Sequence, residues 1–500
     1  MLGVCNITSA TIRGVEAKLV RVEVSINSGV VGMSIVGMPD AAVQEARERV
    51  RAAIRACGYQ MPPYRIVVNL APGSLKKTGS GFDLPIALGI LIASGQIPPE
   101  PLEGKLVVGE LSLDGRTREV PGMLSFEICA RNAGLSFLCP ANASSVMEIE
   151  GVQLVGIGSL ADLHTGEFDI PRGSVREPAT THDFREVGGH ELAKRAFQIA
   201  ATGGHGLMMV GPPGSGKTML AERLPSILPD LNEAERLETA QIYSAAGEDI
   251  SSVVCGIRPF RHPHHSISTA GLLGGGSPVR PGEVSLAHNG VLFLDEVSQF
   301  SRATLQGLRQ PMEDRKITIV RAEGAFTMPA QFMLVTASNP CPCGYLGDPE
   351  IQCRCSEAEI IAYQGKLGGP LIDRIDLQLD VWRTSFENVV HAGSDISSSK
   401  LREGVNRGRE FRSWREAEFG VSVHRVDKGE PMPDLLARNH VDRAAEQFLR
   451  EAAYNNAMSG RSIVRTVGIA RTIADMDESV EVKTEHMAEA FAFRLREVAK

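Results

Sequence analysis

The chain has 500 residues, of which 43% are hydrophobic and 22% are charged. This composition excludes overall disorder, and at roughly 150 residues per domain the length suggests about three domains. The net charge of −8 argues against a surface coated with basic residues for nucleic-acid binding, although it permits a small basic surface on an acidic body.

No targeting or membrane-spanning segment is expected from the sequence. The first basic residue is Arg13, so the positively charged start of a secretory signal is missing. The longest apolar run, Leu84–Ala93, is too short to cross a bilayer. Five of the nine cysteines are scattered singly in apolar surroundings, which is typical of reduced thiols in a core. We therefore expect a cytoplasmic protein that does not bind membranes.

Residues 1–165 show alternating strand and helix patterns. The segment 19–26 alternates apolar and polar residues, which predicts a half-buried strand, and 65–70 predicts a second one. Helices are expected over 41–57 and, after a glycine-rich turn, over 84–94. The pattern therefore predicts an α/β domain.

Two boundaries divide the rest of the chain. Residues 166–183 lack periodicity and contain prolines, glycines and hydroxyl side chains, which predicts a linker. Residues 184–385 start with an expected helix over 191–202 that leads into an apolar strand, 207–210. From 386 to 500 the pattern is mostly helical and polar, so it predicts a helical third domain.

A glycine-rich loop follows the strand at 207–210. It matches the phosphate-binding pattern G-x-x-x-x-G-K-[ST] in full, through Gly211, Pro212, Pro213, Gly214, Ser215, Gly216, Lys217 and Thr218. Its backbone N–H groups are expected to surround the phosphates of ATP. Lys217 would neutralise phosphate oxygens, and the Thr218 hydroxyl would bind Mg²⁺. ATP and Mg²⁺ are therefore the expected cofactors.

Two further apolar strands lead to polar side chains. The run 291–294 is followed by Asp295 and Glu296. We expect Asp295 to hold the Mg²⁺ and Glu296 to polarise the attacking water as general base. The strand over 331–337 leads to Asn339, whose amide can orient the same water. The alternative is an ordinary strand that ends in a solvated acidic turn.

These motifs resemble those of the AAA+ ATPases, in particular the magnesium-chelatase-like group and, within it, the ComM/YifB family of bacteria. The most specific marks are Pro263–His265, Gly274–Gly276, Pro281–Glu283, Asn339–Cys343, Gly369–Asp376 and Ala470–Asp475. The resemblance covers essentially the whole chain. It implies an α/β P-loop core, a C-terminal helical lid and a ring, expected to be a homo-hexamer.

The resemblance also implies roles for two arginines. Arg374 matches the family's arginine finger, which stabilises charge on the phosphoryl group held by the neighbouring subunit. The lid arginine that senses the γ-phosphate in the same subunit is assigned to Arg465, with Arg461 as the alternative. Gly468 stands where relatives carry a basic residue, so the lid departs from the family pattern.

Residues 1–165 resemble the proteolytic domain of the Lon proteases. The matching stretches are Val67–Gly73, Lys77–Asp83, Gly109–Gly115 and Leu138–Asn142. Lon enzymes use a serine that is activated by a lysine. Here Gly81 and Leu124 stand at those two positions, and Ser80 is one residue away. We therefore expect an inactive domain with a scaffolding or nucleic-acid-positioning role.

Two segments of the core are expected to face the pore of the ring. Arg258–His265, together with Arg280, gives an insert with a local positive bias. The segment 316–328 predicts a β-hairpin with Gly324 in its turn and Arg321 near its tip. Hairpins at similar places in related ring helicases contact nucleic acid, so single-stranded or branched DNA is the expected partner. The alternative is that the insert only builds the subunit interface.

The four remaining cysteines lie in one short stretch. They form two C-x-C pairs: Cys341, Cys343, Cys353 and Cys355. Four sulfur ligands could hold a structural Zn²⁺ with tetrahedral geometry. Packed or redox-active thiols in a reducing compartment are the alternative.

The leading hypothesis is an ATP-driven ring motor that acts on DNA. The resemblance to the ComM/YifB family implies a branch-migration helicase of recombination and, in competent hosts, of natural transformation. A chelatase-type motor that drives metal insertion is one alternative. A protein-remodelling AAA+ ATPase is another, and the segment 272–276 is its only candidate for an apolar pore loop.

Overall fold

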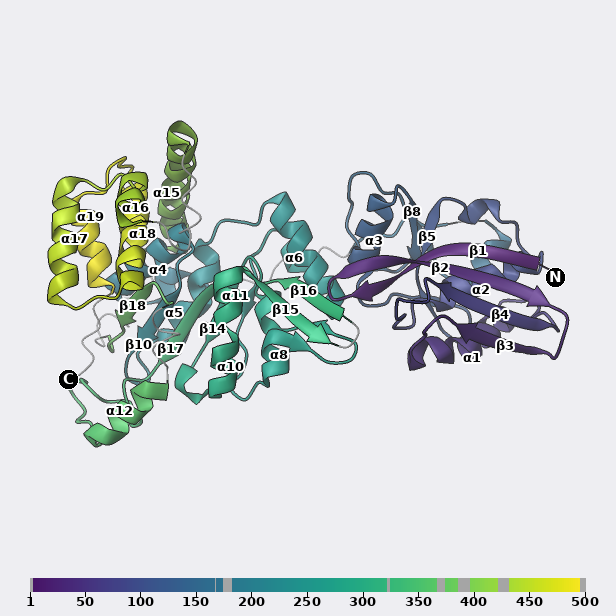
Figure 1. Ribbon diagram of the computed structural model, residues 1–500, viewed down its shortest axis with the longest axis horizontal. Coiled ribbons are helices and arrows are strands. Elements are labelled where there is room, and N and C mark those ends of the chain that lie inside the picture. The colour runs from purple at the N-terminus through teal and green to yellow at the C-terminus, as the bar shows by residue number, and fades with distance from the viewer. Residues whose placement is uncertain are drawn as a thin grey trace.

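The N-terminal part of the chain is built around a seven-stranded mixed sheet (Figure 1). The computed structural model describes residues 3–166, 168–173, 182–321, 324–366, 374–384, 396–420 and 431–494. In spatial order the strands are β3 (Gly32–Val36), β4 (Arg65–Ala71), β2 (Glu16–Asn27), β1 (Gly3–Arg13), β5 (Lys105–Val107), β8 (Ser136–Pro140) and β9 (Leu154–Ile157). The short strands β6 (Glu110–Leu111) and β7 (Thr117–Arg118) form a separate ribbon.

Three helices cover this sheet: α1 (Ala41–Ala56), α2 (Asp83–Ala93) and α3 (Met123–Asn132). Asp40 begins α1 by accepting a hydrogen bond from the backbone N–H of Val43 (2.9 Å). The apolar face of α1 packs into the same core as α2 and the inward side chains of β2. The predicted strands at 19–26 and 65–70 and the predicted helices at 41–57 and 84–94 are confirmed to within a few residues.

A five-stranded parallel sheet forms the centre of the chain. Its order is β11 (Phe260–Arg261), β14 (Val291–Leu294), β17 (Met333–Ser338), β10 (Leu207–Val210) and β18 (Leu377–Asp380). The helices of this part are α4 (Glu191–Gly203), α5 (Lys217–Arg223), α6 (Glu233–Ala246), α7 (Ser251–Val254), α8 (Thr269–Leu273), α9 (Glu283–Leu286), α10 (Arg302–Gly307), α11 (Arg309–Asp314) and α12 (Glu357–Lys366). Uniformly apolar β10 and β14 are buried throughout, as a parallel sheet requires.

The described helices that follow the core are α15 (Ser398–Phe419), α16 (Met432–Arg438), α17 (Arg443–Asn455), α18 (Gly460–Met476) and α19 (Thr484–Ala492). Side chains of α18 and α19 share one hydrophobic core with α4 and β10, so this lid is joined to the nucleotide-binding core through apolar packing. No helix of the described residues is long and apolar enough to span a membrane. Half of the predicted linker 166–183, namely residues 167 and 174–181, lies outside the described residues.

The N-terminal domain docks on α6 and on a hairpin made of β15 (Lys316–Arg321) and β16 (Gly324–Pro329). Leu124 of α3 is buried with Phe326 and Met328 of that hairpin. The backbone N–H of Gly122 donates to the carbonyl oxygen of Ser244 in α6 (2.7 Å). Apolar packing and backbone hydrogen bonds therefore join the two domains, which lie end to end in Figure 1.

Candidate functional site

Three parallel strands deliver polar residues to one edge of the core sheet. The strands β14, β17 and β10 are neighbours, and all three are buried along their whole length. The loop 211–216 follows β10, Asp295 and Glu296 follow β14, and Asn339 follows β17. The residues that the sequence assigns to ATP and Mg²⁺ therefore meet at the carboxyl edge of the sheet.

The loop 211–216 takes a conformation that requires glycine at several points. Gly214 and Gly216 have φ angles of 76° and 83°, in the left-handed region. A Cβ atom on Gly211 would lie 1.9 Å from the carbonyl oxygen of Val381. The N–H of Gly211 donates to the carbonyl oxygen of Ser338 (3.2 Å), which ties the loop to the end of β17. These constraints explain the glycines of the phosphate-binding pattern.

Lys217 is nearly buried beside this loop. Its ammonium group donates to the carbonyl oxygens of Gly211 (2.8 Å) and Pro212 (2.9 Å). Burial lowers the pKa of Lys217, and the nearby charges of Asp295 and Glu296 oppose that shift. A desolvated ammonium group held by neutral carbonyls gains a stronger, charge-assisted partner when an anionic phosphate is present. The site therefore fits a nucleotide phosphate.

Asp295 and Thr218 are in direct contact. The Thr218 hydroxyl donates to Asp295 Oδ2 (2.6 Å), and the backbone N–H of Glu296 donates to Asp295 Oδ1 (2.8 Å). A hydroxyl and a carboxylate oxygen are ligands that Mg²⁺ prefers, so this pair fits the ion. Glu296 is exposed and has a left-handed backbone (φ 46°), unlike the buried strand before it.

Asn339 is close to the phosphate loop through a contact that the sequence did not predict. A Cβ atom on Gly344 would lie 2.7 Å from Pro213 Cδ and 3.8 Å from Asn339 Cγ. Gly344 therefore fills the space between the loop and the amide, and any larger side chain would push them apart. In the sequence, the only sign of this contact was Gly344 itself, which follows Cys343.

The two arginines assigned from the family resemblance lie in ion pairs of the single chain. Arg374 is 7% exposed, and its Nε donates to Glu313 Oε1 (2.8 Å). Arg465 of α18 forms an ion pair with Asp376. Glu313 was not singled out from the sequence, although it lies just before the hairpin. Residues 369–373, the part of the motif before Arg374, lie outside the described residues.

Of the two segments expected to face the pore, the hairpin lies beside the ribbon that carries Arg280, whereas Phe260 and Arg261 of the segment Arg258–His265 form β11 at the edge of the core sheet. The predicted hairpin is formed by β15 and β16, where Gly324 pairs with Arg321, and turn residues 322 and 323 lie outside the described residues. The insert contributes a short ribbon of β12 (Gly274–Gly275) and β13 (Arg280–Pro281). A Cβ atom on Gly275 would lie 3.5 Å from Arg321 Nη2. Arg321 and Arg280 are both exposed, so hairpin and ribbon together present a basic surface.

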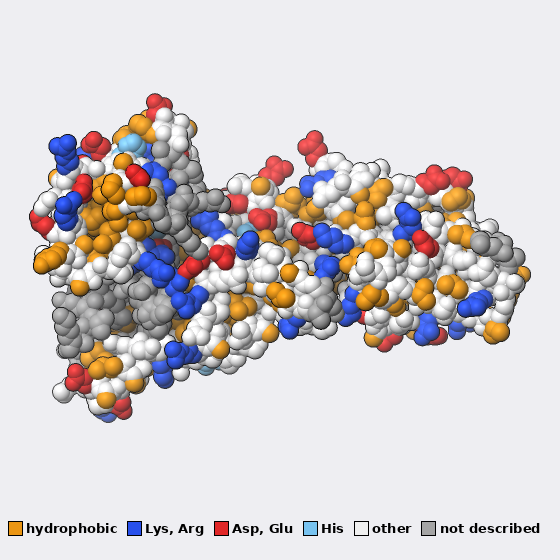
Figure 2. Space-filling view, viewed as in Figure 1, with side chains coloured by type: hydrophobic (Ala, Val, Ile, Leu, Met, Phe, Trp, Pro, Cys, Tyr) orange, Lys and Arg blue, Asp and Glu red, His pale blue; other side chains and the backbone are white. Residues whose placement is uncertain are grey.

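Part of the positive charge expected in the insert is neutralised by the fold. Arg258 forms an ion pair with Glu235 (3.0 Å), and Arg261 donates two hydrogen bonds to Glu283 (2.6 and 2.8 Å). These two guanidinium groups therefore serve in ion pairs within the core and add little free positive charge. On the face drawn in Figure 2, Lys and Arg side chains gather over the core and beside the lid, while acidic side chains are spread more widely.

The Lon-like positions of the N-terminal domain serve packing. A Cβ atom on Gly81 would lie 3.0 Å from Val108 Cγ1, so a serine there would be crowded. Leu124 is fully buried in the contact between the two domains. The Ser80 hydroxyl donates to the carboxylate of Glu110. Such a bond to a carboxylate is not the lysine contact that activates a Lon serine.

The four clustered cysteines have the geometry of a sulfur ligand set. Their Sγ atoms all lie within 4.8 Å of one another. The backbone N–H of Cys343 donates to the sulfur of Cys355 (3.3 Å), and that of Cys355 donates to the sulfur of Cys353 (3.5 Å). Backbone N–H groups, of Arg354 above all, lower the pKa of Cys343 to about 6, while desolvation and the neighbouring thiols raise the pKa values of Cys353 and Cys355. Four converging sulfurs, three of which accept backbone N–H donors, suit a metal ion that prefers thiolates.

Three family models match the chain. Residues 183–389 match the model for magnesium chelatase, subunit ChlI. Residues 22–143 match subunit ChlI of Mg-chelatase, and residues 395–494 match the C-terminal part of that subunit. Together these matches span the N-terminal domain, the nucleotide-binding core and the lid.

Two relatives match over nearly the whole chain, and a third matches over about a third of it. The uncharacterized protein YifB of Salmonella typhimurium is 38% identical over 96% of this chain and 95% of its own. The competence protein ComM of Haemophilus influenzae is 37% identical over the same shares. The Holliday junction branch migration complex subunit RuvB of Paenarthrobacter aurescens is 28% identical over 30% of this chain and 33% of its own. The chain belongs to the ComM/YifB family of magnesium-chelatase-like AAA+ ATPases.

Proposed function

We propose that the chain is an ATP-driven ring motor that moves branched or single-stranded DNA in recombination. The observation that carries this proposal is the contact between the ribbon and the hairpin, which presents Arg280 and Arg321 on one exposed surface of an AAA+ core. Because subunits of a ring converge on one axis, a few arginines per subunit suffice to hold a nucleic-acid backbone. The similarity to a competence protein and, over part of the chain, to a subunit of a Holliday junction branch migration complex supports this proposal.

ATP binding and turnover are assigned to the carboxyl edge of the core sheet. Lys217 binds the phosphates, and Thr218 and Asp295 hold Mg²⁺, which would neutralise charge on the β- and γ-phosphate oxygens. Glu296 accepts a proton from the attacking water, and Asn339 orients that water. The contacts of Lys217, Thr218 and Asp295 described above support these roles.

A homo-hexamer in the cytoplasm is the proposed assembly. Arg374 then reaches the phosphates held by a neighbouring subunit, and Arg465 acts on the phosphates of its own subunit. In the single chain these guanidinium groups pair with Glu313 and Asp376, two carboxylates that a phosphate would have to replace. The N-terminal domain, without a serine–lysine pair, has no peptidase activity and supports the hairpin through Phe326 and Met328.

Zn²⁺ is the proposed metal of the four-cysteine cluster. The supporting observation is the convergence of the four sulfur atoms together with the N–H donors that point to them. The ion would be structural, because four protein ligands leave no open position for a substrate.

A branch-migration assay tests the proposed function. The purified chain is mixed with ATP, Mg²⁺ and a fluorescent four-way DNA junction whose arms can exchange. The proposal predicts ATP-dependent release of the labelled arm, and Arg280→Ala combined with Arg321→Ala should abolish it while basal ATP turnover remains. If wild type and the double variant release the arm equally, the hairpin and the ribbon do not contact the DNA. A chelatase-type motor would release no arm at all.

A further inference from the structure

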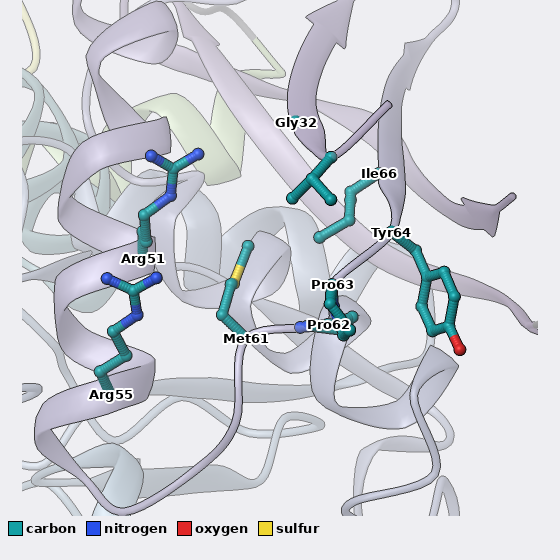
Figure 3. Close-up of a pocket in the computed structure, with 9 residues that line it drawn as sticks. Gly32, Arg51, Arg55, Met61, Pro62, Pro63, Tyr64 and Ile66 are labelled. Carbon is teal, nitrogen blue, oxygen red and sulfur yellow. The ribbon is translucent and has the colours of Figure 1, made fainter. Parts of the chain in front are cut away.

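The N-terminal domain contains a surface pocket far along the chain from the nucleotide site (Figure 3). The pocket has a volume of about 350 Å³ and lies between helix α1 and the start of strands β3 and β4. That volume lies at the lower end of the range of small-ligand sites in proteins. One wall is formed by Arg51 and Arg55 of α1, and Met61, Ile66 and Val31 give it an apolar floor and rim. Among the described residues, no carboxylate lines it.

Arg51 and Arg55 belong to a row of arginines on one face of α1. Arg47, Arg51 and Arg55 are spaced four residues apart, so their side chains emerge one helical turn (about 5.4 Å) apart on the same side. Figure 3 shows the Arg51 and Arg55 side chains one above the other on the helix. We call Arg47, Arg51 and Arg55 the α1 arginine row.

Two of the three guanidinium groups of this row, those of Arg51 and Arg55, have a weak partner or none within the part of the chain that the structure describes, while Arg47 Nε donates to the carbonyl oxygen of Gln44 (3.1 Å). Arg51 meets only Glu48, at 3.8 Å, and Arg55 makes no hydrogen bond or ion pair with its side chain there. Arg49, two residues before Arg51, behaves differently, because it donates two hydrogen bonds to buried Asp83 (2.6 and 3.0 Å). The helix thus uses one arginine for its fold and leaves the row available for an external anion.

Exposed apolar side chains surround the same pocket. Val30 is 89% exposed, Val31 is 66% exposed and Tyr64 is 41% exposed. A row of positive charges beside an apolar, partly aromatic surface is the combination that binds single-stranded nucleic acid, in which arginines hold phosphates and bases pack on apolar side chains. A row of evenly spaced cations also favours a chain of evenly spaced anions over a single carboxylate.

We propose that the α1 arginine row and the adjoining pocket form a second binding site for single-stranded DNA, which holds the strand on the N-terminal domain. The phosphates lie on Arg51 and Arg55, and one base enters the apolar pocket beside Met61 and Tyr64. This inference rests on the proposed function, and it gives the N-terminal domain a role that needs no serine–lysine pair.

Fluorescence anisotropy with labelled oligo(dT) of about 40 nucleotides tests the site on the full-length protein. Arg51→Gln combined with Arg55→Gln should weaken binding at least fivefold at low salt. Each phosphate contact to single-stranded DNA contributes about 0.7 to the slope of log K against log salt, so loss of two contacts should reduce that slope by about 1.4. Basal ATP turnover should not change, because the row is remote from the phosphate loop.

The matched control is Arg21→Gln. Arg21 is exposed on β2, where it alternates with Val20 and Val22, whose side chains are buried in the core shared with α1, so it lies on the opposite face of the sheet. The control should leave both affinity and slope at the wild-type value. Cross-linking with 5-iodo-deoxyuridine in the same oligonucleotide should label the peptide that contains Met61 and Tyr64.

Three results would overturn the inference in distinguishable ways. If the double variant binds oligo(dT) with the wild-type affinity and the wild-type salt slope, the pocket is not a DNA site and the hairpin remains as the proposed DNA contact. A protein that binds no DNA at low salt would fail the proposed function as well. Polyglutamate serves as a second probe. If the double variant binds oligo(dT) normally but no longer binds polyglutamate, the pocket is a site for acidic peptides.

Discussion

Glu296 and Asp295 are adjacent in the chain but have different surroundings. Asp295 accepts hydrogen bonds from Thr218 and from the backbone N–H of Glu296. Glu296 is exposed, and its left-handed φ of 46° is uncommon for a residue with a side chain. Backbone strain of this kind is kept where a side chain must be presented at a defined place. The two neighbouring acids can thus serve different purposes, one as a metal ligand and one as a base.

Glu296→Gln should keep nucleotide binding and lose turnover. The amide preserves the shape of the side chain but cannot accept a proton, so phosphate release should fall at least about 10²-fold. Phosphate release and binding of a fluorescent ATP analogue measure the two properties separately. Glu222→Gln, a change at an exposed position of α5, is the control and should behave as wild type. A normal rate in Glu296→Gln would exclude Glu296 as the base.

Arg374→Ala should lower turnover by about 10³-fold or more, because an arginine that acts on transferred phosphate contributes on that scale. If the arginine acts across the subunit interface, mixing Arg374→Ala with Lys217→Ala should restore part of the rate. In such a mixture, some subunit interfaces pair the intact phosphate loop of one subunit with the intact Arg374 of its neighbour. A mixture of Lys217→Ala with Glu296→Gln should stay inactive, since both defects affect the same half of the site. Absence of rescue at every mixing ratio would place Arg374 outside the trans role.

At the scale of elements, the segment from Cys341 to Cys355 lies directly beside the phosphate loop. Gly344 lies between Pro213 and Asn339, so the path of this segment determines how closely the amide approaches the loop. Gln364 of α12 also donates to the carbonyl oxygen of Pro340 (3.1 Å). A metal ion that fixes the four sulfurs would therefore fix the distance between the amide and the loop.

Cys353→Ser combined with Cys355→Ser should remove bound zinc and lower ATP turnover. The purified wild-type chain should contain about one Zn²⁺ per chain by elemental analysis, and the double variant close to none. Cys255→Ser changes an exposed cysteine outside the cluster and should retain both zinc and activity. Wild-type protein that neither contains zinc nor takes it up under reducing conditions would support packed or redox-active thiols instead.

The N-terminal domain should cleave no peptide. Incubation with ATP, Mg²⁺ and fluorescent casein should give the same signal for wild type and Ser80→Ala, because the Ser80 hydroxyl donates a hydrogen bond to Glu110 and because Leu124, at the position that the Lon resemblance gives to the lysine, is buried. ATP-dependent cleavage that Ser80→Ala abolishes would contradict the assignment of this domain as a scaffold.

Local sequence patterns predicted the helices and strands well, but they could not predict contacts between residues that are distant in the chain. The burial of β10 and β14 follows from uniformly apolar runs, and the loop 211–216 follows from glycines that a tight turn requires. The pairing of Arg258 with Glu235 depends on how α6 packs, so the positive charge expected for the insert from its sequence exceeds the free positive charge in the folded chain. Phe326 and Met328 were predicted as part of a hairpin, but their burial against the N-terminal domain needed the tertiary structure.

For the whole molecule, the net charge of −8 describes its outer surface and says little about a binding site. The exposed arginines of the hairpin, the ribbon and the α1 arginine row are few and local. The N-terminal domain, the core and the lid are joined by shared apolar clusters, so a change at the phosphate loop can be transmitted to the hairpin and from there to the N-terminal domain. DNA binding and ATP turnover should therefore be coupled.

The rate of ATP turnover of the purified wild-type chain, measured without DNA, with single-stranded DNA and with a four-way junction, tests this coupling most directly. We predict a rate that rises several-fold with either DNA, that falls back as salt screens the phosphate contacts, and that does not respond to DNA in the Arg280→Ala, Arg321→Ala double variant. An equal rate with and without DNA at low salt, in a protein that binds neither DNA, would contradict the assignment of this ATPase as a DNA motor.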